Sequence, residues 1–204
     1  PDDSYIITPF LSSVVFELVG PAAYFGIRFR LLGHHSIIKE PLDTWADFNS
    51  AIKASDIIPG TLYEKVQATI AQSVDFKNKC ELVSQVLLDE TKETSIDKRL
   101  VNYIVYCQKN IASHINLSNK QCADFGLSSR HLRRLSQLYL GLSPRQFARV
   151  LRFQQTLKLM NLFPSQTNWQ DYYYDQSHFI KEFKCLSGLT PNELANLSVL
   201  YNKK

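Results

Sequence analysis

Arginine side chains are concentrated in one short stretch of the sequence. Six of the nine arginines lie between positions 130 and 152, namely Arg130, Arg133, Arg134, Arg145, Arg149 and Arg152. A guanidinium group can bond guanine bidentately, and the amide of a glutamine such as Gln137 can do the same with adenine. This combination indicates recognition of a nucleic acid by hydrogen bonding.

The two halves of the chain carry opposite net charge. Residues 120–204 contain 12 Lys+Arg and 5 Asp+Glu, a net +7, whereas residues 1–119 contain 11 and 14, a net −3. A half this basic suits a polyanion, because phosphates attract it and the release of counterions favours binding. A solvated basic face without a partner is the alternative explanation of the charge alone.

Other chemistry has little support in the residue pattern. The five histidines lie near no nucleophile or carboxylate at catalytic spacing, and the seven glycines form no phosphate-binding loop. His34 and His35 are a candidate metal pair, but adjacent residues of a strand point to opposite faces and no acidic or cysteine cluster is near. We therefore expect no enzyme, no metal and no cofactor.

The four cysteines predict a reducing environment. Cys80, Cys107, Cys122 and Cys185 form no Cys-x-x-Cys pair, and we expect them to be small buried residues of a cytoplasmic protein. No apolar run is long enough to span a membrane, and no signal peptide is visible. The chain begins at Pro1 and its only methionine is Met160, so we expect a fragment of a longer protein.

One four-residue motif occurs twice in the basic half, with serine or threonine at its third position. Gly141-Leu142-Ser143-Pro144 recurs 47 residues later as Gly188-Leu189-Thr190-Pro191. Glycine is favoured just past a helix end, serine and threonine are good N-caps, and proline fits the first helical position. Each copy of the motif therefore predicts that one helix ends and another begins.

Residues 117–141 have the spacing of a helix-turn-helix. Ser118 is expected to cap a short helix that contains Cys122, Gly126 to form the turn, and Ser128-Ser129 to cap a second helix over residues 129–140. Leu132, Leu135 and Leu138 would face inward. Residues 172–188 repeat the pattern with Phe179, Phe183 and Leu186 inward, and residues 144–162 predict a long connecting helix. Two reading helices in successive major grooves would lie about 34 Å apart.

The acidic half predicts a small α+β region. We expect about three short strands within residues 4–32, including 23–32, and then a loop from Gly33 to Pro41. Helices are expected from Asp43-Thr44 (with Trp45, Phe48 and Ile52 on one face), from Thr61, and over residues 76–88. A polar linker over residues 89–95 separates the domains, 1–92 and 93–204, and a longer helix with Leu100, Tyr103 and Ile104 on one side follows it.

These motifs resemble a known family. Residues 125–132, 141–144 and 151–153, and then 173–184 and 188–191, resemble the C-terminal domain of AraC/XylS-type transcriptional regulators over about residues 96–200. More weakly, Phe25-Gly26-Ile27-Arg28-Phe29-Arg30 resembles the last strand of a cupin-like sensor domain, and the segment from Trp45 resembles the helices that follow it. The second motif departs from the pattern at Tyr172, and residues 162–171 are about three residues short, so its first helix is expected to be stunted.

The resemblance implies a mainly α fold with a seven-helix double helix-turn-helix domain, preceded by the small α+β region. It implies a transcription regulator, such as an activator, that binds promoter DNA. RNA polymerase and a second copy of the chain are further candidate partners, no membrane is expected, and no effector ligand follows from the sequence. The expected DNA-binding residues are Ser129, Arg130, His131, Arg133, Arg134, Gln137, Arg145, Gln176, Ser177, His178, Lys181 and Lys184. The alternative is a protein-interaction regulator whose DNA binding is weak or non-specific.

Overall fold

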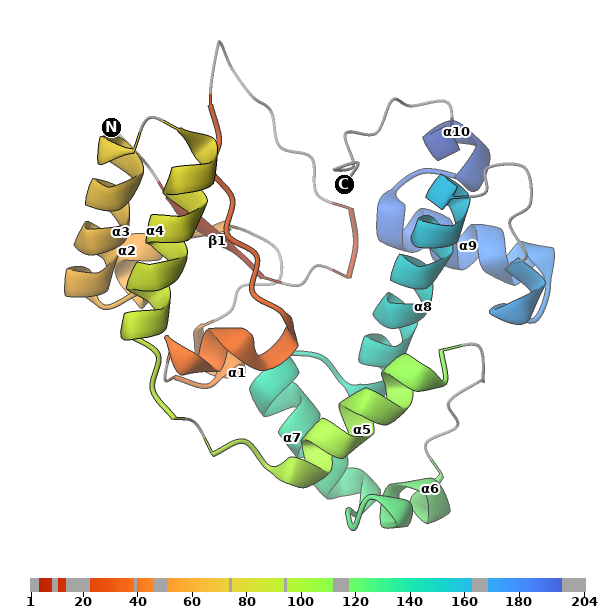
Figure 1. Ribbon diagram of the computed structural model, residues 1–204. Helices are drawn as coiled ribbons and strands as arrows, with labels where there is room; N and C mark the ends of the chain where they lie inside the picture. The colour runs from red at the N-terminus through yellow and green to blue at the C-terminus, as the bar shows by residue number, and fades with distance from the viewer. Residues whose placement is uncertain are drawn as a thin grey trace. The chain divides into compact units, whose positions relative to one another are not determined.

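The computed structural model describes residues 4–8, 11–13, 23–38, 40–45, 51–73, 75–93, 95–111, 118–162 and 169–195. The fold is mainly helical with a small two-stranded sheet near the N-terminus, as expected (Figure 1). The chain divides into two compact units, one of residues 1–9, 19–96 and 137–141, the other of residues 10–18, 97–136 and 142–204. The domain division at residues 92 and 93 stays a prediction.

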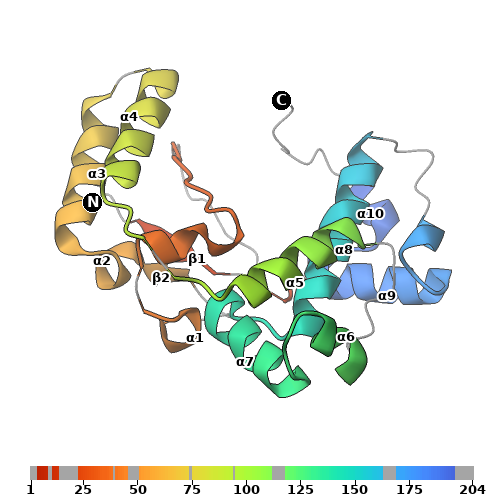
Figure 2. The same cartoon turned by 60° about the horizontal axis from the view of Figure 1, so that its bottom comes forward.

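In its described residues, the first unit combines the sheet with four α-helices. Strand β1 (Tyr5–Ile7) pairs antiparallel with β2 (Ala51–Lys53), so that Ile6 lies opposite Ile52. The helices are α1 (Leu42–Trp45), α2 (Ala54–Ile57), α3 (Gly60–Gln72) and α4 (Phe76–Asp89). Helices α3 and α4 lie side by side (Figures 1 and 2).

The core of this unit is aliphatic. Ile37, Ile38 and Leu62 are buried at its centre. Side chains from β1 and from α1 to α4 pack around them, among them Ile6, Trp45, Val66 and Val86. The amphipathic spacing of α3 and α4 therefore orients their apolar faces toward each other and toward this core.

Several expectations for the first unit were wrong. Residues 23–30 form no strand, and residues 31–36 form a 3-10 helix, η1, where a strand end and a loop were expected. Alternation over 23–32 was misleading because both sets of side chains are largely exposed, so no buried face selects a sheet partner.

The helix expected from Asp43 is also interrupted. Its described part, α1, reaches Trp45, and Ile52 belongs to β2 instead, because β1 pairs with that strand. Helix α3 begins at Gly60 after Pro59, so Thr61 is not its cap. The strand expected around residues 14–19 and the position of Phe48 lie outside the described residues.

The regular elements in the described part of the second unit are all helices. Its helices are α5 (Lys98–Lys109), α6 (Asn119–Asp124), α7 (Ser129–Leu140), α8 (Pro144–Leu162), α9 (Gln176–Ser187) and α10 (Pro191–Ala195), with a 3-10 helix, η2 (Trp169–Asp171). The last residues of α7, from position 137, are assigned to the first unit. Of the seven helices that the resemblance implied, the described residues contain six as α-helices. The first helix of the second motif falls partly on residues 163–168, outside the described residues, so its stunting stays a prediction; residues 169–171 form η2.

The repeated Gly-Leu-Ser/Thr-Pro motif ends one helix and begins the next in both copies, as expected. Gly141 and Gly188 have left-handed backbones with φ of 65° and 78°. Ser143 and Gln146 form a capping box at the start of α8, with Ser143 N donating to Gln146 Oε1 at 2.8 Å and Gln146 N to Ser143 Oγ at 3.3 Å. Thr190 and Glu193 form the same arrangement before α10.

The core around α7 joins four helices. Leu100, Tyr103 and Ile104 of α5 are buried with Leu132 and Leu135 of α7, confirming the faces expected of both helices. The Tyr103 hydroxyl donates to the Pro144 main-chain oxygen at 3.1 Å, and Phe125 lies edge-on to Tyr103. Burial raises the pKa of Tyr103 far above its usual value, so this hydroxyl remains a hydrogen-bond donor. Helix α5 therefore packs against the start of α8 and against Phe125.

Candidate nucleic-acid interface

Helices α6 and α7 are connected by a tight turn at Gly126. Gly126 adopts φ of 68°, and Leu127 N donates to the Cys122 carbonyl at 3.1 Å, closing the end of α6. Cys122 and Leu127 are buried beside the turn. Of the four cysteines expected to be buried, Cys107 and Cys122 are, whereas Cys80 is only half-buried and Cys185 is exposed. Ser118 and Ser128 cap α6 and α7 through bonds to Gln121 N and His131 N. The local geometry is thus helix, turn, helix.

The outward face of α7 carries the predicted cations. Arg130, Arg133 and Arg134 are exposed, whereas Leu132, Leu135 and Ser136 are buried on the other side. Arg145 is exposed at the second residue of α8. Four of the predicted cations are therefore accessible, and the three on α7 come from its first two turns, where a reading helix approaches base edges.

Other predicted residues of α7 make bonds within the protein. The Ser129 hydroxyl donates to Asn119 Oδ1 and so joins α7 to α6. Arg134 Nη2 lies 3.2 Å from His131 Nε2. Gln137 Nε2 donates to the Gly141 main-chain oxygen at 3.1 Å, so its amide is used at the end of the helix. These side chains therefore stabilise α7 through their bonds and also lie on its surface.

Ser136 is a polar residue on the buried side of α7. It is fully buried, and its hydroxyl donates to the Leu142 main-chain oxygen at 2.6 Å. A buried hydroxyl is tolerated when it has such a partner. The polar residue therefore fixes the chain just past the Gly141 turn.

A pair of residues on α5 supports the turn, and the sequence analysis missed it. Arg99 Nη1 donates to the Gly126 main-chain oxygen at 3.2 Å, while its Nε and Nη2 donate to the Asp97 carboxylate at 3.0 and 2.7 Å. The side-chain and main-chain hydrogen bonds from Arg99 to Asp97, and more weakly the nearby His131, hold the pKa of Asp97 down at about 2. Asp97 also caps α5. Only the Asp-x-Arg spacing at a helix start could have suggested the pair.

Helix α9 presents the second predicted set. Gln176, Ser177, Lys181 and Lys184 are exposed, and Phe179, Phe183 and Leu186 are buried, as expected. The Asp175 carboxylate caps the helix by accepting from His178 N at 2.7 Å. Phe179 and Phe183 form a core with Tyr173, and Phe153, Leu157 and Met160 of α8 pack against it. The long helix α8 therefore holds α9 through an aromatic cluster.

A carboxylate on the inner side of α9 faces three cationic or titratable groups. Glu182 has only 10% of its side chain exposed, and its oxygens lie 3.7 Å from Arg149 Nε, 3.3 Å from Arg152 Nε and 3.3 Å from His178 Nε2. Arg152 also stacks over the Tyr173 ring. Two arginines of the basic stretch are thus used inside the protein. The sequence pattern gave no sign of this, because Glu182 is 30 positions away from Arg152.

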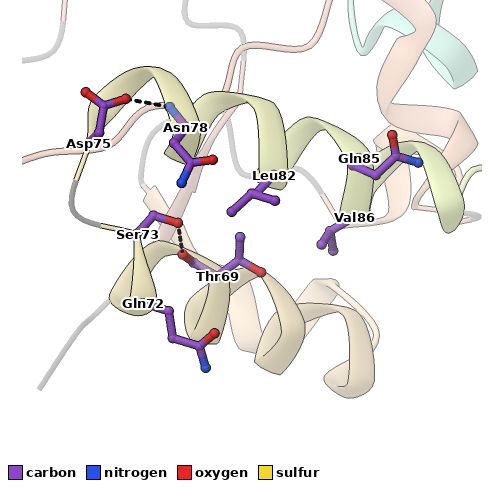
Figure 3. Close-up of a pocket in the computed structure, with 8 residues that line it drawn as sticks. All are labelled: Thr69, Gln72, Ser73, Asp75, Asn78, Leu82, Gln85 and Val86. Atoms are coloured by element: carbon purple, nitrogen blue, oxygen red, sulfur yellow. Dashed lines mark hydrogen bonds between the residues drawn. The ribbon is translucent and has the colours of Figure 1, made fainter.

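The first unit contains a pocket between α3 and α4 (Figure 3). Six of its eight lining residues have polar side chains, but most of these side chains bond within the helices. Asp75 accepts from Asn78 N, Ser73 Oγ donates to the Thr69 carbonyl at 2.8 Å, and Gln85 donates to Asp89. Leu82 and Val86 of α4 supply the apolar lining. Few polar groups of the pocket lining are therefore left to recognise a ligand.

The described residues contain no cluster of three or more metal-ligating side chains. His34 and His35 stack with ring centroids 4.0 Å apart, and His35 Nε2 lies 3.0 Å from the Tyr139 main-chain oxygen. Both rings therefore take part in packing. No helix among the described residues is long and apolar enough to cross a membrane.

Comparison with known proteins gives one match. Residues 121–196 match the model of a protein family described as a helix-turn-helix domain. The matched segment contains α7 to α10 and most of α6. It supports an AraC-type helix-turn-helix domain in this part of the chain, and a DNA-binding regulator in general. No curated protein and no solved structure matches the chain.

Proposed function

We propose that this AraC-type helix-turn-helix region binds duplex DNA sequence-specifically, with α7 and α9 as reading helices in adjacent major grooves. In this proposal the protein is a transcription regulator, an activator at promoter DNA in the cytoplasm. The exposed arginines on the first two turns of α7, opposite a fully buried face, are the observation that carries it.

The roles of the α7 side chains follow from their positions. Residues near the N-terminus of a reading helix reach base edges, and later ones reach the phosphates. Arg130 is therefore assigned to a guanine edge, and Arg133 and Arg134 to the next bases or phosphates. Arg145, at the positive end of the α8 dipole, is assigned to a phosphate.

Helix α9 is assigned the same role with a different composition. Gln176 and Ser177 lie in its first turn, where they can bond base edges, and Lys181 and Lys184 follow as phosphate contacts. His178 is only half-exposed and lies against Glu182, so we assign it to positioning Glu182 rather than to reading bases.

The connecting helix has a suitable length for this arrangement. Helix α8 has 19 residues, which corresponds to about 28 Å at the usual rise per residue. Successive major grooves on one face of DNA are separated by about 34 Å. A rigid connector of this length is compatible with two helices that read one turn apart.

Selection from a random duplex library, followed by anisotropy titration with the full chain, tests the proposal. We expect a consensus, and affinity for it that falls steeply with salt. Arg130→Ala should weaken binding by about 1–3 kcal/mol and relax the preference at one base pair. Lys77→Ala is the matched control, because Lys77 is an exposed cation on α4, with 85% of its side chain accessible.

Two outcomes count against the proposal. Equal affinity for the selected and a scrambled duplex would leave only generic polyanion attraction. Unchanged binding by Arg130→Ala and Arg134→Ala would instead favour a regulator that acts through protein contacts.

A further inference from the structure

One apolar side chain lies on the otherwise polar outward face of α9. Positions 177, 180, 181 and 184 are separated by three, four and seven residues, so they share one side of the helix. Ser177, Lys181 and Lys184 are exposed there, and 37% of Ile180 is exposed beside them. Ile180 was not among the residues that the sequence indicated for DNA binding.

Ile180 is not one of the residues that form the buried side of α9. Its inner face is made by Phe179, Glu182, Phe183 and Leu186, again at helical spacing. The core there is completed by side chains of α8 together with Tyr172 and Leu194. Ile180 therefore has a surface position on the face that our proposed function directs at DNA.

Among the bases, only thymine offers an apolar group in the major groove. Its C5-methyl group is read by apolar contact, whereas the other base edges are read by hydrogen bonds. A branched aliphatic side chain beside two lysines of the same helix face combines the two requirements of such a contact. The lysines attract nearby phosphates, and the aliphatic group meets the methyl and excludes water.

We infer that Ile180 contacts the C5-methyl group of a thymine in the part of the DNA site read by α9. This inference rests on the proposed function and adds the base that α9 prefers. Single exposed apolar residues are common on protein surfaces, so exposure alone would not carry it. The inference rests instead on the position of Ile180 beside the lysines on the outward face of α9.

Replacing thymine by deoxyuracil removes this methyl group and leaves the hydrogen-bonding edge intact. Each thymine of the selected duplex is replaced in turn, and the dissociation constant of the full chain is measured by anisotropy. We expect wild type to lose affinity roughly fourfold at one thymine, the effect of one buried methyl group. In Ile180→Ala that same replacement should have no further effect, because the two changes remove one contact.

Two control variants separate this contact from general effects. Lys181→Ala should bind all duplexes more weakly and lower the salt slope by about 1, yet keep the uracil effect. Leu88→Ala truncates an apolar side chain on α4 that is 62% exposed, and should behave as wild type.

The outcomes distinguish this inference from the function on which it rests. A selected consensus with no uracil effect in wild type, or with every uracil effect retained in Ile180→Ala, overturns the role of Ile180 only. A selection without any consensus overturns both.

Discussion

At the scale of single residues, arginines that look alike in the sequence have different roles. Arg130, Arg133, Arg134 and Arg145 are exposed, whereas Arg149 and Arg152 lie against Glu182 with 27% and 18% of their side chains accessible. A cation beside a buried carboxylate is already partly neutralised. The positive charge available to DNA is therefore smaller than the sequence count suggests.

Arg152→Ala and Arg145→Ala should separate stability from binding. Removing Arg152 leaves Glu182 with weaker compensation, so the free energy of unfolding should fall by about 2 kcal/mol. Removing Arg145 should leave stability unchanged and reduce the salt slope of DNA binding by about 1. Urea denaturation and anisotropy, applied to both variants, measure this, and equal stabilities of the two would contradict the role given to Glu182.

His34 should make the stability depend on pH. Burial, and then the neighbouring His35, lower the pKa of His34 from 6.5 to about 4, although its bond to the Leu31 carbonyl opposes this. The unfolded chain therefore takes up a proton near pH 6.5, while the folded chain does so only near pH 4. The free energy of unfolding should fall as pH decreases through this window, with the loss complete below it.

The measurement is urea denaturation at a series of pH values, with His34→Gln as the comparison. Carboxylates that titrate in the same window affect both proteins equally, so the difference between the curves isolates His34. Parallel curves for the two proteins would show that the histidine makes no contribution.

At the scale of elements, turns and caps decide where each helix ends. Three glycines, Gly126, Gly141 and Gly188, adopt positive φ, and two capping boxes begin α8 and α10. These are local bonds between residues at most a few positions apart. This is why the bounds of α7 and α8 could be predicted from sequence.

Gly126→Ala should destabilise the turn between α6 and α7. A Cβ at this position meets only Arg99 Cδ at 3.6 Å, so the cost comes from the left-handed backbone and is about 1 kcal/mol. Gly126→Asn should cost less, because asparagine tolerates this conformation. Thermal denaturation of both variants checks the order, and a larger loss with asparagine would contradict it.

At the scale of the whole molecule, the halves differ in both charge and architecture. The basic residues 120–204 contain all the helices assigned to DNA, whereas residues 1–119 are acidic and contain the sheet and the α3–α4 pair. The strand expected over residues 23–32 does not form, and the reason involves the whole molecule. Strand pairing depends on a distant partner, and local alternation does not show whether one exists.

The sequence by itself determined the helices of the basic half, their caps and their buried faces. Each of these depends on spacing within about one or two turns, as Leu132 and Phe183 illustrate. Only the tertiary structure decided which polar side chains remain available. It assigned Arg152 to Glu182, Gln137 to Gly141 and Arg99 to the Gly126 turn, and it left Ile180 on the surface. The pairings of Arg152 and Arg99 and the exposure of Ile180 depend on how helices and turns meet, which is a property of packing that no local pattern records.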